Sequence, residues 1–483
     1  MAQALALVTY AVLFVCISVL VYVTFAVSLR LFRLYRSPLR NVPGPPSFSW
    51  FFGSVRGVTE ADADRLIDHW AQKYGRTFKY SSFFNADKLF TLDLKALQFV
   101  LNSPNFEKSE QLKFALGQLL GNEKSAELRD IWYTQLIQYA RPDGKLEVDA
   151  FQWMNRVTLD IIGLAGFNYE FHSMHISSGE THELHEAVRK MFDFEAFTVS
   201  FLVQALFPLT RVLPTQRSRS TAQSLEVIRR IGTRMIAEKK AEILATTHIV
   251  KSKDVTSRDI LSLLIKSNMA TDLQESDRMS DEEILSQIPA FLVAGHETTS
   301  ASVTWALFAL ATHPLVQSKL RSELLQVRTN NPTMEELNAL TYLDATIRET
   351  MRLHAPVAFT ERVATTNMVV PLDRPYIDKN GVHQTALQPE RWFKTNDEVR
   401  AVPSAWSNIM SFLSGPHACI GYRFAVLEMK SLLFTLVKSF EFELAIQAED
   451  VGRKSNIVGR PYICSNPGAG PQLPLLIREV QGG

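Results

Sequence analysis

The chain has 483 residues, of which 46% are hydrophobic and 21% are charged, as is usual for a globular protein with a substantial core. Its 51 basic and 50 acidic residues give a net charge of +1, which leaves no basic footprint, so no nucleic-acid partner is expected. Its three cysteines, Cys16, Cys419 and Cys464, exclude a disulfide framework and favour a reducing compartment.

The N-terminal residues 1–29 carry no charged side chain. They are predicted to form a transmembrane helix, because about 20 apolar residues cross a hydrocarbon core of roughly 30 Å. The alternative is a cleaved signal peptide, which has a basic start and a shorter apolar stretch. The arginines that follow predict a cytosolic body, since positive flanks stay on that side: Arg30, Arg33, Arg36 and Arg40. The proline-rich residues 30–53 are expected to be a linker, and residues 54–483 to form one globular domain.

The next predicted elements are a helix over Thr59–Tyr74, ended by Gly75, and a strand pair within Thr77–Leu92. Asp93 is positioned to cap a short helix through Val100. From about residue 128 to residue 325 most segments have the periodicity of helices.

Two helices have clear starts. The capping box Ser280-x-x-Glu283 predicts a largely apolar helix from Asp281 to about Thr312, and Thr333-x-x-Glu336 predicts a second one to about Leu353. The C-terminal third is irregular and has clusters of Pro and Gly. The predicted fold class is therefore mainly α with minor β.

The segment around Cys419 carries the most specific pattern. Cys419 precedes an apolar helix predicted over Arg423–Phe440, where the helix dipole lowers the pKa of a thiol. Gly415 and Gly421 flank the cysteine, and such glycines let a flat ligand approach the backbone and supply amides to the sulfur. A buried, inert cysteine is the alternative, but it does not explain these glycines together with Phe412.

This spacing, Phe-x-x-Gly-x-x-x-Cys-x-Gly, resembles the haem-binding loop of the cytochrome P450 superfamily, and in particular its membrane-bound fungal microsomal members. The resemblance implies the P450 fold, haem b as cofactor, and Cys419 as the iron ligand. It also implies that His417 stands where the family usually has an Arg that pairs with a haem propionate. Imidazole is the weaker partner, because it is only partly charged near neutral pH.

The predicted apolar helix contains the polar segment Ala294–Thr299, Ala-Gly-His-Glu-Thr-Thr. A threonine hydroxyl in such a helix can bond back to a carbonyl and bend it, and an adjacent carboxylate can relay protons. The alternative is a helix-packing notch. The segment resembles the family's oxygen-activating motif, which implies proton handling by Thr298 and Glu297 beside a haem-facing Ala294 and Gly295. His296 is interpreted as surface or hydrogen-bonded filler and not as a second iron ligand.

The pair Glu349 and Arg352 lies on one face near the end of the second capped helix. By the resemblance, Arg391 of Pro389-Glu390-Arg391 joins them in a buried structural charge network. The residues just after Pro356 are expected to line the substrate pocket, with plain core as an equal alternative: Val357, Ala358 and Phe359.

The sequence departs from the family in two stretches. No helix with Trp-x-x-x-Arg precedes the helical region, since Trp132 is followed by Leu136 at the expected position. In addition, Arg391 lies only 39 positions after Arg352 (391 − 352), where the family has further strands. An incomplete gene model or a catalytically impaired paralogue is therefore an alternative to an active enzyme.

The resemblance implies a haem-thiolate monooxygenase of the endoplasmic reticulum membrane, with residues 54–483 as its cytosolic catalytic domain. It would take electrons from NADPH through a flavoprotein reductase and insert one oxygen atom into an apolar small molecule. A haem-thiolate isomerase or dehydratase is the other enzymatic alternative, although the intact Glu297-Thr298 pair argues against it.

Overall fold

The computed structural model divides the chain into two compact units. The first comprises residues 1–97 and 370–384, and the second residues 98–369 and 385–483. The structure describes residues 39, 42–49, 53–54, 63–81, 87–93, 96–97, 99–100, 106–107, 122–175, 183–192, 216–249, 259–268, 278–360, 363–364, 404–406, 408–455 and 458–480. The predicted bounds of anchor, linker and catalytic domain stay predictions.

The described part of the first unit holds helix α3 (Ala63–Tyr74) and an antiparallel pair, β1 (Thr77–Ser81) with β2 (Asp87–Thr91). Their apolar faces form a small core in which the Phe78 and Phe90 rings stack at 4.9 Å. The predicted strand pair is confirmed. Asp93 also caps as predicted, because its Oδ1 accepts a hydrogen bond from the Ala96 amide at 2.9 Å.

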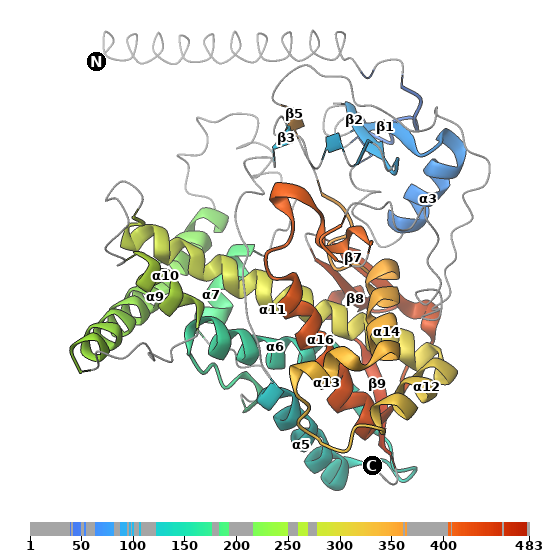
Figure 1. The fold of residues 1–483 in the computed structure, drawn as a ribbon. Coiled ribbons are helices and arrows are strands. Elements are labelled where there is room, and N and C mark those ends of the chain that lie inside the picture. Colours follow the sequence, from blue (N-terminus) through green and yellow to red (C-terminus); the bar gives the residue numbers. More distant parts are fainter. Residues whose placement is uncertain are drawn as a thin grey trace, which may run out of the picture. The chain divides into compact units, whose positions relative to one another are not determined.

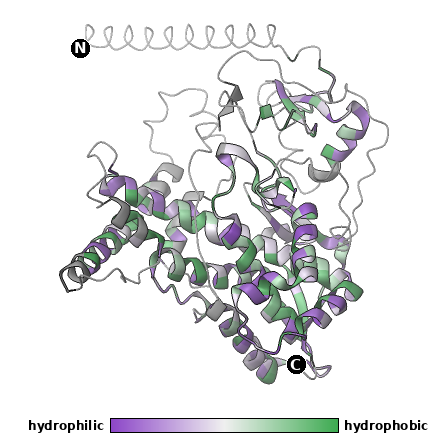
Figure 2. Cartoon of the chain, in the orientation of Figure 1, coloured by the Kyte–Doolittle hydropathy of each residue, from purple (hydrophilic) through white to green (hydrophobic). Residues whose placement is uncertain are grey.

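The second unit is a helical bundle (Figure 1). Its helices are α5 (Asn122–Tyr139), α6 (Ala150–Phe167), α7 (Glu183–Phe192), α9 (Gln216–Ile249), α10 (Ile260–Asn268), α11 (Asp281–Thr312), α12 (Pro314–Leu324), α13 (Met334–Ala339), α14 (Thr341–Leu353) and α16 (Tyr422–Ser439). Polar and apolar residues alternate along many of them, as Figure 2 shows, which is the pattern of helices with one face on a core.

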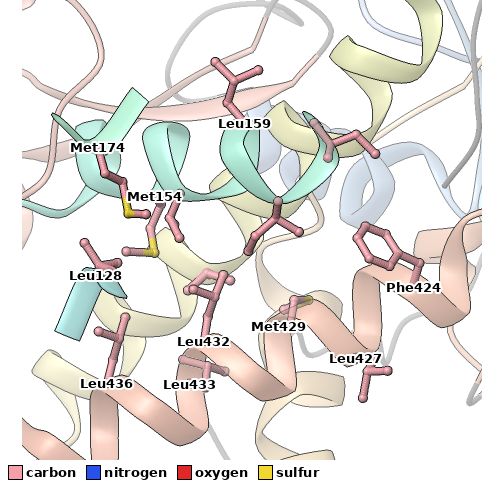
Figure 3. Packing of buried hydrophobic residues seen from close by; sticks show 14 of the residues in the cluster. Leu128, Met154, Leu159, Met174, Phe424, Leu427, Met429, Leu432, Leu433 and Leu436 are labelled. Carbon is pink, nitrogen blue, oxygen red and sulfur yellow. The ribbon is translucent and has the colours of Figure 1, made fainter. Parts of the chain in front are cut away.

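Helix α11 is the long helix that the sequence predicts. Ser280 Oγ accepts a hydrogen bond from the Glu283 amide (3.2 Å), and a Glu283 carboxylate oxygen accepts one from the Ser280 amide (2.6 Å). The helix packs against α6 and α16, and most of its side chains are buried. In Figure 3, Met154 of α6 and Leu432 of α16 are among the apolar side chains that fill the shared core.

The prediction of one helix from Thr333 to Leu353 is wrong. The second capping box forms, but α13 ends at Ala339 and α14 begins at Thr341, with Leu340 extended between them (φ −77°, ψ 97°). The break is stabilised from another element, because the Glu323 carboxylate of α12 accepts hydrogen bonds from the Tyr342 and Leu343 amides at 2.7 and 2.8 Å. These amides are at the start of α14, where a helix lacks internal acceptors.

The described sheets are small and antiparallel. The largest has three strands in the order β4 (Leu146–Asp149), β9 (Pro474–Glu479), β6 (Phe440–Leu444). The other two in this unit are the hairpin of β7 (Val451–Ser455) with β8 (Gly459–Ile463), and β3 (Phe106–Glu107) with β5 (Val363–Ala364). Helices therefore dominate, and the expectation of mainly α with minor β is confirmed.

Of two features singled out in the N-terminal half of the sequence, Trp132 is described and the anchor is not. Trp132 of α5 is fully buried, with its ring edge-on to Phe440 at 5.7 Å and to Phe442 at 6.3 Å, so it is a core residue. The predicted anchor over residues 1–29 lies outside the described residues. Among the helices that are described, none combines the length and apolarity that a bilayer crossing requires.

Candidate active site

The cysteine loop, defined here as residues 408–421, connects to the N-terminus of α16. It contains two single 3-10 turns, η6 (Met410–Phe412) and η7 (Gly415–His417). The Cys419 amide donates to the Phe412 carbonyl at 2.8 Å, and the Ala418 amide donates to the Gly415 carbonyl at 3.0 Å. These bonds hold the backbone around Cys419. As predicted, Cys419 lies just before α16, two residues ahead of its N-cap Gly421. Cys419 is partly exposed and is not in a disulfide.

Three residues of the loop have positive φ: Asn408, Leu413 and Gly415. Gly415 lies at φ 68°, a region that glycine enters without a steric penalty. Leu413 lies at φ 58° and ψ −167°, which is rare for a residue with a Cβ. Backbone strain of this kind persists only where surrounding contacts over-determine the conformation, and it gathers at functional sites. The strained backbone therefore indicates that this loop is a functional site and does not only connect two elements.

The surrounding contacts are present on both sides of the loop. Phe412 is buried, and its ring meets the Trp406 ring edge-on at 5.5 Å. The Ala405 amide donates to the Leu413 carbonyl at 2.7 Å. Ser411 Oγ donates to the Met351 carbonyl at the end of α14, at 2.8 Å. The loop is thus tied to the helix that carries the predicted Glu349–Arg352 pair.

In α11, the polar segment Ala294–Thr299 forms regular helix. Thr298 Oγ1 donates to the Ala294 carbonyl at 2.7 Å, which is the back-bonding that the sequence predicts. Ala294, Gly295 and Thr298 are partly exposed, whereas the residues on either side along the helix are mostly buried. The helix therefore has an accessible stripe at the predicted position.

Gly295 also has a packing role. A Cβ at this position would lie 2.7 Å from Cγ1 and Cδ1 of Ile162 on α6, so the glycine allows the two helices to approach closely. The packing notch that the sequence left as an alternative is thus present at Gly295, which also belongs to the accessible stripe.

His296 is buried, and its Nδ1 lies 2.7 Å from the Leu292 carbonyl. Burial lowers the pKa of His296 and keeps the ring neutral. Of the two sequence interpretations, the surface position is wrong and the hydrogen-bonded filler is confirmed.

Glu297 is 8% exposed and forms an ion pair with Arg460 of β8, with Nη2 2.7 Å from Oε2. The sequence analysis missed Arg460, which is 163 positions away and follows no local spacing pattern. It also missed Glu428 of α16, which is 2% exposed and faces the Thr299 hydroxyl of α11. Burial raises the pKa of Glu428 well above its usual value. A lone acid in the apolar α16 was the available signal.

The structural pair is present. Arg352 Nε donates to Oε2 of Glu349 and Arg352 Nη2 donates to Oε1, both at 2.9 Å. The Glu349 side chain is fully buried. This two-bond geometry is the strong form of a charge pair. Arg391, the third predicted member, lies outside the described residues, so its place in the network stays a prediction.

The predicted pocket residues follow α14 and are accessible. Val357 is 39% exposed, Phe359 is 45% exposed, and Ala358 is also exposed. The plain-core alternative is therefore wrong. The Pro356 carbonyl just before them accepts a hydrogen bond from the Gly459 amide at 2.7 Å, which joins this stretch to the β7–β8 hairpin.

With this geometry described, comparison with known proteins defines the class. The family model described as Cytochrome P450 matches residues 79–377 and 386–460. Cytochrome P450 monooxygenases 205 and 128 of Postia placenta are 41% and 40% identical, each over 92% of this chain and over 94% and 93% of their own lengths. Cytochrome P450 monooxygenase claP of Ampulloclitocybe clavipes is 30% identical over 94% of this chain and 95% of its own. The chain belongs to the cytochrome P450 family, and thus to the monooxygenase class of oxidoreductases.

The same comparisons bear on the two departures. The alignment with monooxygenase 205 runs over 513 positions, which exceeds the 483 residues of this chain, so the relative has residues that this chain lacks. The family match is interrupted between residues 377 and 386, inside the segment that the sequence analysis found short.

The family implies haem, and the described residues fit such a group. A sulfur that is partly accessible is available at Cys419. Ser414 Oγ, in the same loop, is buried and has no hydrogen-bond partner within the described part of the chain. The accessible stripe at Ala294, Gly295 and Thr298 offers small side chains beside a hydroxyl, which suits a flat aromatic ligand.

Proposed function

We propose that this chain is a haem-thiolate monooxygenase that inserts one oxygen atom from O₂ into an apolar small molecule, with electrons from NADPH through a flavoprotein reductase. The observation that carries the proposal is the cysteine loop, where Cys419 precedes α16 in a loop that contains three residues with positive φ. The family membership of the chain supports it.

In this proposal Cys419 binds the iron of haem b as thiolate. Phe412, Gly415 and Gly421 shape the loop around the sulfur, and His417 is the candidate donor to a propionate. When bound, the haem would supply oxygen activation, and a thiolate ligand favours cleavage of the O–O bond. The surrounding residues determine how protons and substrate reach it.

Proton handling is assigned to Glu297 and Thr298. The Thr298 hydroxyl holds its hydrogen bond to the Ala294 carbonyl at 2.7 Å, and rotation away from that carbonyl would free it to donate or accept elsewhere. Glu297 directly precedes Thr298 in α11, and its carboxylate forms an ion pair with Arg460 of β8. A carboxylate and a hydroxyl adjacent in one helix turn form a relay for protons through water.

The substrate pocket is assigned to the accessible residues after α14, Val357, Ala358 and Phe359. An apolar side chain that is about half exposed loses water contact when a ligand covers it, and this favours an apolar ligand. The chain is further proposed to be anchored in the endoplasmic reticulum membrane by residues 1–29, with its catalytic domain in the cytosol and its reductase beside it.

The deciding experiment is the reduced carbon monoxide difference spectrum of the full chain. The wild type is expected to give a red-shifted Soret band, and Cys419→Ala is expected to lose it with most of the bound pigment. Cys464→Ala is the matched control, because Cys464 is an exposed cysteine outside the loop, and it is expected to keep the band. An unchanged spectrum for Cys419→Ala contradicts the proposal.

NADPH-dependent oxygen uptake with a flavoprotein reductase separates the enzymatic alternatives. A haem-thiolate isomerase or dehydratase needs neither NADPH nor oxygen, so absence of uptake by a chain that shows the red-shifted band would favour that class. Absence of the band in the wild type would favour the impaired paralogue or incomplete gene model.

A further inference from the structure

The ion pair between Glu297 and Arg460 joins α11 to the β7–β8 hairpin. The Arg460 Nη2 atom lies 2.7 Å from Glu297 Oε2, and only 10% and 25% of the Glu297 and Arg460 side chains are exposed. A carboxylate removed from water needs a partner of opposite charge or several hydrogen bonds. In the described part of the chain, the hydrogen-bond partner of Glu297 beyond α11 is Arg460.

The hairpin that carries Arg460 is fixed next to that residue. The Gly459 carbonyl accepts a hydrogen bond from Trp305 Nε1 of α11 at 2.9 Å, and the Gly459 amide donates to the Pro356 carbonyl at 2.7 Å. Val458 packs with Ala301 and Trp305. Since Glu297, Ala301 and Trp305 recur every four residues, they lie along one side of α11. The start of β8 therefore packs along this side of α11, and its Arg460 forms the ion pair with the Glu297 carboxylate.

The contact engages one oxygen of the carboxylate. Arg460 bonds Oε2, and the neighbouring Thr298 hydroxyl is directed to the Ala294 carbonyl. The orientation of the Glu297 carboxylate is thus determined by the hairpin and not by its own helix.

Resting on the proposed function, we propose that Arg460 is a positioning residue for Glu297: the β7–β8 hairpin anchors one carboxylate oxygen and directs the other toward the water that carries protons to the oxygen site. The role of proton donor stays with Glu297 and Thr298, and Arg460 acts through them. Loss of Arg460 leaves a carboxylate that rotates freely and has an uncompensated charge.

The first test measures the ion pair itself and needs no turnover. Thermal unfolding of the full chain is compared for Arg460→Gln, Glu297→Gln and the double variant. Arg460→Gln is expected to lower Tm in the wild-type background and to have a much smaller effect when Glu297 is already Gln. Additive shifts would overturn the proposal.

The second test measures proton delivery. With NADPH and a flavoprotein reductase, the share of consumed O₂ that is released as hydrogen peroxide is expected to rise by about twofold or more in Arg460→Gln, since a misplaced proton donor favours peroxide release. Arg460→Lys, which keeps the charge but not the planar fork, is expected to restore part of the loss. An unchanged peroxide share in Arg460→Gln would overturn the proposal.

Lys454→Gln is the matched control. Lys454 is exposed and pairs directly across from Arg460 in the hairpin. The substitution therefore removes one positive charge from the neighbouring strand and leaves the ion pair with Glu297 in place. It is expected to change neither Tm nor the peroxide share. A wild-type chain without the carbon monoxide band contradicts the proposed function, whereas a normal band with additive Tm shifts contradicts only the role of Arg460.

Discussion

The cysteine loop and the middle of α11 hold their candidate residues in opposite ways. In the loop, position comes from the backbone: Leu413 and Gly415 have positive φ, and the Cys419 amide bonds the Phe412 carbonyl. In α11 the backbone is regular helix, and the chemistry depends on side chains, such as Glu297 with its ion pair to the hairpin.

This difference determines which substitutions each region tolerates. A regular helix accepts many side chains as long as its packing faces are kept, so α11 is sensitive only at its close contacts and at its polar residues. A loop with strained backbone depends on residues that can adopt the required φ. Glycines make the contrast measurable, because each region contains one with a different reason for being there.

Gly295→Ala is expected to have one of the two largest effects. Alanine is the better helix former by about 1 kcal/mol, but its Cβ would lie 2.7 Å from Ile162, and overpacking of this kind costs about 1–3 kcal/mol. A net loss of stability is therefore expected in urea unfolding.

The control for Gly295→Ala is Gly166→Ala in α6, the helix that carries Ile162. There the new Cβ meets Ile162 at an ordinary 3.6 Å and Ile260 of α10 at 3.7 Å, so stability is expected to be kept or to rise. The double variant Gly295→Ala with Ile162→Ala is expected to lose less than the sum of the single variants. A fully stable Gly295→Ala would show that close packing does not limit α11.

A loss of stability of similar size is expected for Gly415→Ala, because φ 68° places a Cβ close to the carbonyl at a cost of about 1–2 kcal/mol. Gly470→Ala imposes the same type of strain at φ 83° with no atoms nearby and lies outside the cysteine loop. Both variants are expected to lose similar stability in urea, but only Gly415→Ala is expected to lose pigment. Equal pigment in the two variants would show that the loop backbone does not position the sulfur.

The smallest effect concerns Glu428 of α16, the helix that follows the cysteine loop, which faces Thr299 of α11. Burial raises the pKa of Glu428 above its ordinary 4.5. Above that value the unfolded chain loses a proton that the folded chain keeps, so this group makes the free energy of unfolding fall as pH rises. Glu428→Gln removes this term and is expected to flatten the decline in Tm above about pH 5.

The control for Glu428→Gln is Glu335→Gln, which makes the same change at an exposed position of α13 and is expected to leave the pH dependence of Tm unchanged. A decline in Tm that is as steep in Glu428→Gln as in the wild type would show that Glu428 is already ionised in the folded protein.

Local signals predicted the elements that are determined locally. Helix α11 was predicted with its observed ends because Ser280 and Glu283 cap it and Pro314 follows it. The loop before α16 was predicted from the spacing of its glycines around Cys419. Both depend on residues within a few positions of one another, which a single sequence displays.

Elements determined from a distance were not predicted. The break between α13 and α14 depends on Glu323 of α12, and the orientation of Glu297 depends on Arg460. Strand β9 pairs with β4 and β6, although nothing in its own residues indicates which partners it has. Such pairings follow from tertiary packing, and the periodicity of one segment carries no information about them.

The pairing of β9 also bears on the order of folding. Strand β4, residues 146–149, has β9, residues 474–477, as its partner in the three-stranded sheet. During synthesis the ribosome releases β4 long before β9. The apolar face of β4 therefore lacks its partner strand while the helices between the two strands form. Contacts between such remote segments form slowly, which makes closure of this sheet a late step in folding.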